Sequence, residues 1–166
     1  MSTRATTDER TGEAVEPQDD AAPPLNRMIV AVLALVGVLI STYMLLYHLG
    51  LIGTIACGTG GCQTVQNSPW ASFLTVPVPL IGLLGYGLLF GTALLGTSDS
   101  FYADRRIAVV LVTGALIGVG FSLYLTYLEM YVIHAWCRWC IASAIIAGLL
   151  FVAVIPEFAR MRRSAS

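Results

Sequence analysis

The sequence predicts an all-α integral membrane protein whose four transmembrane helices form a bundle. Apolar residues make up 57% of its 166 residues and charged residues only 11%, a balance typical of membrane proteins. Four apolar runs cover residues 28–49, 78–97, 107–128 and 135–155. Each is about 20 residues long, enough for a helix to cross a hydrocarbon core roughly 30 Å thick. None alternates like a strand, and a helix satisfies its own backbone hydrogen bonds in lipid.

The segments at the two ends complete this architecture. Residues 1–26 are polar, acidic and contain proline, so we expect a disordered cytosolic tail. This segment is too long and too acidic for the start of a signal peptide. Residues 27–158 are the predicted four-helix domain, whose last apolar run stops at Pro156. Residues 159–166 are predicted to be a basic cytosolic tail.

The longest connection, residues 50–77, is predicted to be an outer loop that contains one short interfacial helix. Ser68 precedes Pro69, and this pair suits a helix N-cap followed by proline in the first turn.

The arginines predict the orientation in the membrane. They precede the first run, lie between the second and third, and follow the fourth: Arg27, Arg105, Arg106, Arg160, Arg162 and Arg163. The connections 50–77 and 129–134 contain no Lys or Arg. The positive-inside rule therefore predicts that both termini and the 98–106 loop are cytosolic, and that the other two connections face outward. The net charge of −1 gives no indication of a nucleic-acid partner.

All four cysteines fall on the predicted outer side. Cys57 and Cys62 form a C-x4-C pair among glycines, and Cys137 and Cys140 form a C-x-x-C pair where the fourth helix begins. Outside the cytosol, thiols tend to become disulfides. Three interpretations follow: two static disulfides, a four-cysteine zinc site, or two redox pairs.

The C-x-x-C pair favours redox chemistry. A disulfide across so small a ring constrains the unfolded chain less than a long-range bridge does. A helix N-terminus stabilises a thiolate, and Arg138 adds a positive charge inside the motif. A structural zinc usually organises a small polar domain, whereas here the bundle supplies the structure. We therefore predict no metal.

These residues together resemble the vitamin K epoxide reductase family in its bacterial form. The matching pattern is a spaced cysteine pair in the first outer loop, a serine six residues later, a tryptophan, and a C-x-x-C that opens the last helix: Cys57, Cys62, Ser68, Trp70, Cys137 and Cys140. The segment VPVPLIGLLGYG, residues 76–87, also resembles the entry to that family's second helix. The resemblance covers roughly residues 28–155.

The resemblance implies a membrane thiol oxidase that supports disulfide formation in exported proteins. Its partner would be a thioredoxin-like (DsbA-like) oxidase, whose thiolate attacks Cys57. Cys62 would then attack Cys137 of a Cys137–Cys140 disulfide, and Cys140 would be released beside a quinone, either menaquinone or ubiquinone. A glycine-rich loop suits this movement, because exchange needs an accessible sulfur. The protein would lie in the bacterial inner membrane, in contact with lipid and quinone.

A quinone is also the simplest electron exit, because the sequence has no flavin, nucleotide or c-type haem motif. The resemblance assigns Ser68 to support of the cysteine and quinone chemistry. Several apolar and aromatic residues are candidates to line a quinone pocket: Phe73, Leu80, Leu83, Tyr86 and Tyr124. We interpret Glu129 as a marker of the membrane boundary, with proton handling as the alternative. We interpret His134 as an interfacial residue, with a role as a base as the alternative.

Two departures and two rival interpretations limit this resemblance. Vertebrate members carry Thr-Tyr-Ala after the C-x-x-C, whereas Ile-Ala-Ser-Ala follows here at 141–144, so their anticoagulant binding is not expected. Many bacterial relatives carry a fused thioredoxin-like domain. Only eleven residues follow Ile155, so we expect the partner to act in trans. A DsbB-type oxidase has the reverse order of cysteine pairs. The remaining alternative is a non-enzymatic tetraspan scaffold with static disulfides.

Overall fold

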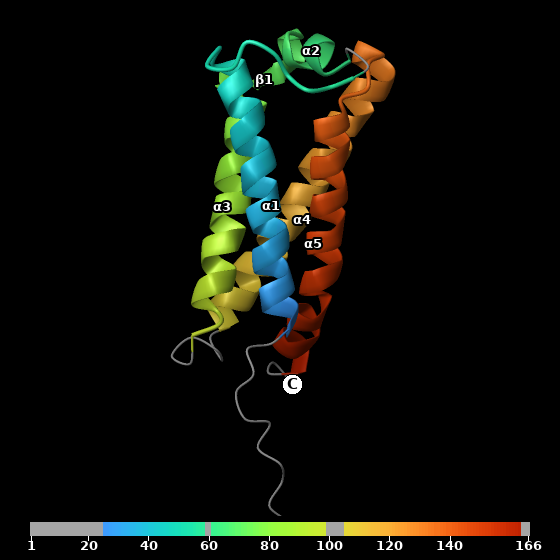
Figure 1. The fold of residues 1–166 in the computed structure, drawn as a ribbon. Helices are drawn as coiled ribbons and strands as arrows, with labels where there is room; N and C mark the ends of the chain where they lie inside the picture. The colour runs from blue at the N-terminus through green and yellow to red at the C-terminus, as the bar shows by residue number, and fades with distance from the viewer. Residues whose placement is uncertain (1–24, 59–60, 99–104, 164–166) are drawn as a thin grey trace, which may run out of the picture.

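The chain forms a bundle of four long helices, as the sequence predicts (Figure 1). The computed structural model describes residues 25–58, 61–98 and 105–163. The long helices are α1 (Leu25–His48), α3 (Val78–Leu95), α4 (Arg105–Leu128) and α5 (Arg138–Arg163). Each contains a segment long and apolar enough to cross a membrane, so this is a multi-pass membrane protein. Of the predicted disordered tail, residues 1–26, the first 24 lie outside the described residues, but Leu25 and Asn26 already belong to α1, so the tail ends earlier than predicted. Most of the predicted 98–106 loop also lies outside the described residues.

Small residues allow the helices to pack closely. Helix α1 contacts both α3 and α5, and α4 contacts α5 and α3. The ring of Tyr86 on α3 lies directly against Gly37 on α1, where an added Cβ would be only 2.5 Å from the ring. The Tyr86 hydroxyl donates a hydrogen bond of 2.8 Å to the Ser143 carbonyl on α5. One tyrosine thus connects three helices near the middle of the bundle.

A buried ion pair ties three helix ends together at the end of the bundle opposite the cysteines. Arg27 near the start of α1 bonds Glu157 on α5 through Nε and Nη2, at 2.8 and 3.0 Å. Its Nη1 also donates to the carbonyl of Gly96, just after α3. Asn26 adds a fourth hydrogen bond, to the same carboxylate. Both charged groups are almost completely buried, so their mutual pairing and hydrogen bonds are needed to offset lost hydration.

Helix α5, which carries Glu157 of this ion pair, ends later than predicted. The sequence predicts that the apolar run stops at Pro156 and that the four-helix domain ends at residue 158, but α5 continues through this proline to Arg163. Part of the predicted 159–166 tail is therefore helical. Proline removes one helical hydrogen bond, yet Glu157, the next residue, is held by Arg27 and Asn26. The tertiary contact outweighs the local preference.

The connection between α1 and α3 is more structured than predicted. It contains the helix α2 (Gly61–Gln66), a 3-10 turn (Pro69–Ala71), and the strands β1 (Ser72–Phe73) and β2 (Val76–Pro77). The strands pair antiparallel around Leu74 and Thr75, which both have positive φ. The predicted short helix is thus joined by a second helical turn and a small hairpin. The whole loop covers one end of the bundle (Figure 1).

Ser68 does not cap the turn that follows it. It occupies the N-cap position before Pro69, but its side chain makes no capping hydrogen bond. The hydroxyl instead donates back to the Val65 carbonyl at 2.7 Å. Ser68 therefore secures the end of α2, and the predicted cap is wrong in its hydrogen bond although right in its position.

Candidate redox site

Both cysteine pairs lie in one buried cluster at the loop end of the bundle. Cys57 and Cys62 form a disulfide, whereas Cys137 and Cys140 are free thiols. Cys57, Cys62 and Cys137 belong to the same hydrophobic cluster and are 3%, 0% and 0% exposed. Cys140 packs on its edge. The structure therefore brings together all four predicted cysteines, with one pair oxidised and one reduced.

Gly61 makes the close packing of the two pairs sterically feasible. This glycine begins α2, one residue before Cys62. A Cβ at this position would lie 2.3 Å from the carbonyl oxygen of Trp136, the residue before Cys137. Any side chain here would push the loop disulfide away from the C-x-x-C.

Two aromatic side chains hold the loop on its other flank, at the residue before Cys57. The Ala56 N–H donates to the Tyr43 hydroxyl at 3.0 Å. The Trp139 indole N–H donates to the Ala56 carbonyl, also at 3.0 Å. The two rings contact each other with centroids 5.0 Å apart. Trp139 lies between the cysteines of the C-x-x-C. The contacts of Tyr43 and Trp139 therefore couple the position of the loop disulfide to that of the second cysteine pair.

The expected accessibility of Cys57 is not what the structure shows. An accessible Cys57 was expected in the glycine-rich loop, but its sulfur lies in the apolar cluster with Cys62. The loop must therefore open before a protein thiolate can reach Cys57.

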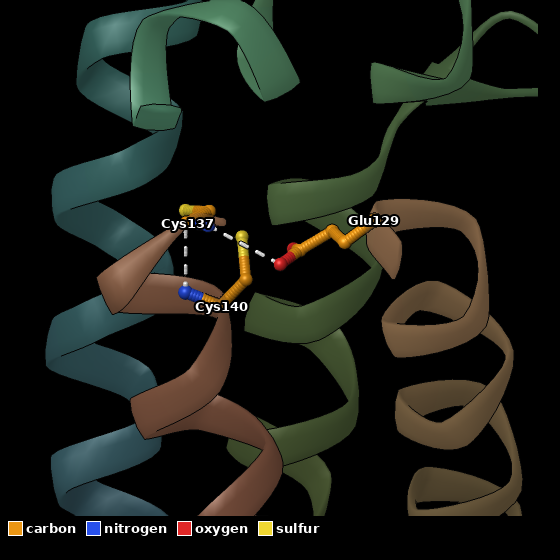
Figure 2. A group of neighbouring side chains, drawn as sticks. All are labelled: Glu129, Cys137 and Cys140. Carbon is orange, nitrogen blue, oxygen red and sulfur yellow. Dashed lines mark hydrogen bonds between the residues drawn. The ribbon is translucent and has the colours of Figure 1, made fainter. Parts of the chain in front are cut away.

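The C-x-x-C sits at the start of α5, where backbone donors and a carboxylate surround it (Figure 2). The Cys140 N–H donates to the Cys137 sulfur at 3.3 Å. The Cys137 N–H donates to Oε2 of Glu129 at 3.2 Å. Hydrogen bonding from the Cys140 thiol holds the pKa of Cys137 below its ordinary value, more than compensating for burial. Of the two thiols, Cys137 is the one that lies within the buried cluster of the loop disulfide.

A large apolar cavity adjoins Cys140. Its volume is about 590 Å³, within the range of sites for small organic molecules. Cys140 lines it, whereas Cys137 does not. The two sulfurs thus have different surroundings, because Cys137 contacts the loop disulfide cluster and Cys140 faces the cavity.

The cavity contains some of the predicted lining residues and not others. Phe73 and Tyr86 line it, although the Tyr86 hydroxyl is already bonded to Ser143. Leu80, Leu83 and Tyr124 do not line this cavity, and neither does Ser68. The roles assigned to these four residues in quinone chemistry stay predictions.

Two polar residues also line the cavity: Gln66, which the sequence did not indicate, and Glu129, which we interpreted as a marker of the membrane boundary. Gln66 at the end of α2 is 8% exposed, and its Oε1 has no hydrogen-bond partner among the described residues. Glu129 is 4% exposed and begins the π-helical segment η2 (Glu129–Ile133), which follows α4. Nothing in the sequence marks Gln66 as special, but a carboxylate at the end of an apolar run was a usable signal for Glu129. His134, next to this segment, is exposed and has positive φ, which agrees with an interfacial position.

Glu129, Cys137 and Cys140 offer one oxygen and two sulfur atoms within 4.8 Å of one another. Such a set would be short of the four ligands of a structural zinc site. A dithiol that forms and breaks its own disulfide explains the same proximity, and we interpret the group as a redox pair with an adjacent carboxylate.

The fold and the paired cysteines define a four-helix membrane protein with a dithiol and a disulfide in contact at one end. The model of the vitamin K epoxide reductase family matches residues 28–155. The chain belongs to this family, and it is a membrane redox enzyme.

The packing at Gly61 gives the first prediction. In a Cys57→Ser/Cys140→Ser background, only Cys62 and Cys137 remain, and we expect them to form a disulfide on mild oxidation. Adding Gly61→Ala should slow this disulfide by about tenfold to a hundredfold, because a small displacement of reacting groups is costly. Gly53→Ala is the matched control, since nothing lies within 4 Å of its added Cβ. Equal rates in the Gly61 and Gly53 variants would contradict the packing argument.

Proposed function

We propose that the protein is a thiol oxidase that reoxidises a thioredoxin-like partner and passes the electrons to a membrane quinone. The partner would in turn insert disulfides into exported proteins. One observation carries the proposal: the Cys57–Cys62 disulfide, Cys137, Cys140 and the cavity follow one another in space. A static scaffold has no need of this order.

Electrons would move along this order by two exchanges. The partner thiolate attacks Cys57, which breaks the Cys57–Cys62 bond and leaves Cys62 as a thiolate. A second partner thiol displaces Cys57, and the partner departs oxidised. Cys62 attacks Cys137 of an oxidised C-x-x-C, and closure of the loop disulfide leaves Cys137 and Cys140 reduced. That final state has the pairing described above, with an oxidised loop and two free thiols.

The low pKa of Cys137 supports its place in this sequence. Thiol exchange is faster when the leaving sulfur is a stable thiolate. Hydrogen bonding from Cys140 favours the thiolate of Cys137, which is the form released when Cys62 recloses its bond to Cys57.

The cavity fits a quinone by its size, its apolar walls and its few polar groups. Gln66 is the clearest sign of a ligand, because a buried amide oxygen without a partner is costly. Amide oxygen and nitrogen are interchangeable by rotation, so Gln66 can also direct its NH2 donor toward a quinone carbonyl. Gln66 and the walls at Phe73 and Tyr86 would hold the quinone beside Cys140. The quinone supplies a two-electron acceptor that diffuses in lipid.

The arginine distribution supports the orientation proposed for the bacterial inner membrane. The start of α1 and the end of α5 lie at the end of the bundle opposite the cysteines (Figure 1). The positive-inside rule assigns that arginine-containing end to the cytosol. The redox site would then face the oxidising compartment, where an exported thioredoxin-like partner acts.

The decisive experiment follows quinone absorbance while the purified protein oxidises a reduced thioredoxin-like partner. Cys140→Ala should abolish steady-state quinone reduction, because this variant cannot form the C-x-x-C disulfide. It should still oxidise about one equivalent of partner through the loop. Ala142→Ser, on the same helix, is the control and should retain turnover. Normal turnover in Cys140→Ala would refute the proposed electron route.

Gln66 gives a separate test of the quinone site. Gln66→Leu keeps a similar side-chain volume but removes the hydrogen-bonding amide. We expect the KM for quinone to rise by roughly 2- to 10-fold, the effect of losing one ordinary hydrogen bond. Gln63→Leu removes an exposed amide of the same short helix and should leave the KM unchanged. A rise in both variants would indicate a general effect on α2.

Capture of the partner tests both the docking sulfur and the orientation. A thioredoxin-like protein that lacks its second cysteine, expressed on the outer side of intact cells, should accumulate as a mixed disulfide. Mass spectrometry should find it on Cys57, because Cys62 must turn inward to Cys137. Capture only by a cytosolic partner would reverse the orientation. Capture chiefly on Cys137 or Cys140 would indicate the pair order of DsbB-type enzymes.

A further inference from the structure

We propose that Glu129 is a catalytic residue that takes the proton from Cys140 when the C-x-x-C is oxidised and delivers it to the acceptor in the cavity. This inference rests on the proposed function, because it assumes that the acceptor is a quinone. It adds a proton path to the electron path.

Geometry places Glu129 between the two partners of this transfer. Its carboxylate and the Cys140 sulfur turn toward one another from adjacent elements (Figure 2). The carboxylate oxygen and both C-x-x-C sulfurs lie within 4.8 Å of one another. Glu129 and Cys140 also line the same cavity. A carboxylate in this position can receive a proton from the Cys140 thiol and release it to a ligand in the cavity without a change in the backbone.

The π-helical segment is what directs Glu129 inward. Helix α4 ends at Leu128, and the chain widens into η2 before the left-handed turn at His134. The Glu129 carbonyl accepts the backbone N–H groups of His134 and Ala135. The side chain accepts the Cys137 N–H. Such π segments occur frequently at functional sites.

The titratable groups nearest to Glu129 are the two thiols of the C-x-x-C. At the start of α5, among the described residues, these are Cys140 in its first turn and Cys137 just before it. On α2, Cys62 is held in the disulfide, and Gln66 does not titrate. On α3, the Tyr86 hydroxyl shares the cavity but is bonded to Ser143. Arg138 is exposed, on the side of Gly58.

The proposed step balances in atoms and electrons. Oxidation of the dithiol breaks two S–H bonds and forms one S–S bond, which releases two electrons and two protons. Reduction of a quinone to a quinol consumes two electrons and two protons as two O–H bonds form. The Glu129 carboxylate accepts the Cys140 proton at its oxygen and passes it to the acceptor, and it then carries the Cys137 proton by the same route, because its oxygen lies within 4.8 Å of both sulfurs. Both protons of the dithiol thus reach the quinol, and the carboxylate is regenerated in each cycle. In this buried site it replaces the water that would otherwise carry the proton.

A structural role is the alternative, because Glu129 also accepts the Cys137 N–H at the start of α5. Glu129→Gln separates the two roles. The amide keeps an oxygen that can accept the same N–H, but it cannot accept a proton from a thiol. Glu129→Asp keeps the carboxylate on a shorter side chain. Tyr131→Phe is the control, since Tyr131 is exposed on the same π-helical segment.

The first measurement needs no quinone. In a Cys57→Ser/Cys62→Ser background, alkylation of the reduced C-x-x-C is followed by mass spectrometry across a range of pH. An ionised carboxylate opposes ionisation of Cys137. Glu129→Gln should therefore shift the alkylation profile toward lower pH by about one unit. An unshifted profile would mean that no ionised carboxylate faces the thiols, and the proposal would fail.

The second measurement is turnover with partner and quinone. Glu129→Gln should lower the rate of quinone reduction by about a hundredfold, the contribution typical of a general acid or base. Glu129→Asp should restore part of it, and partner capture on Cys57 should be unchanged in both. Unchanged partner capture on Cys57 would show that the redox site is still folded while turnover falls. Turnover within about twofold of the unsubstituted protein would refute the catalytic role.

The two measurements also separate this inference from the proposed function. If the unsubstituted protein reduces no quinone, the proposed function fails, while the alkylation profile still reports whether Glu129 faces the thiols. If quinone reduction occurs and Glu129→Gln leaves it intact, only the proton path fails.

Discussion

The contact between Gly61 and the Trp136 carbonyl is the constraint on which the redox site depends. It leaves no space for a side chain, and it sets the loop disulfide against Cys137 in one buried cluster. Close packing makes internal exchange fast, but it also hides Cys57 from any protein partner. The proposed electron route therefore requires the loop to alternate between a closed state and an open one. The two hydrogen bonds at Ala56 suit this, because each contributes only about 0.5–1.5 kcal/mol and docking can replace it.

The rest of the bundle keeps the cavity open beside this loop. Glycines of α3 and α4 line it at Gly82, Gly85, Gly114 and Gly118, so space remains where side chains would otherwise meet. Beside this space, Tyr86 fixes the spacing of α1, α3 and α5 through its contacts with Gly37 and Ser143. At the far end, the buried Arg27–Glu157 pair fixes the same three helices. Leaving either charge unpaired would cost several kcal/mol, which favours a single register.

The four spans and the order of the cysteines could be predicted from the sequence, because the length of an apolar run and the spacing of a motif are local properties. The sequence could not predict which side chains of each helix face the cavity. Helix α3 is apolar almost all round, so no periodicity indicates that Tyr86 lines the cavity while Leu80 and Leu83 do not. The helix beyond Pro156 and the hydrogen bond of Ser68 could not be predicted for a related reason. The local preferences of these two residues for a helix end and a cap are overridden by partners on other elements, or by the end of α2.

The division between the two C-x-x-C sulfurs follows from their place at the start of α5. Cys137 precedes the helix and reaches the loop cluster, whereas Cys140 lies inside its first turn and faces the cavity. Of these two neighbouring thiols, one therefore lies against the loop disulfide and the other lines the apolar cavity. Glu129 is the polar group common to both, because it bonds the Cys137 backbone and lines the cavity beside Cys140. A buried carboxylate is costly in an apolar environment, and the proposed proton path gives this one a function beside two thiols whose oxidation must release protons.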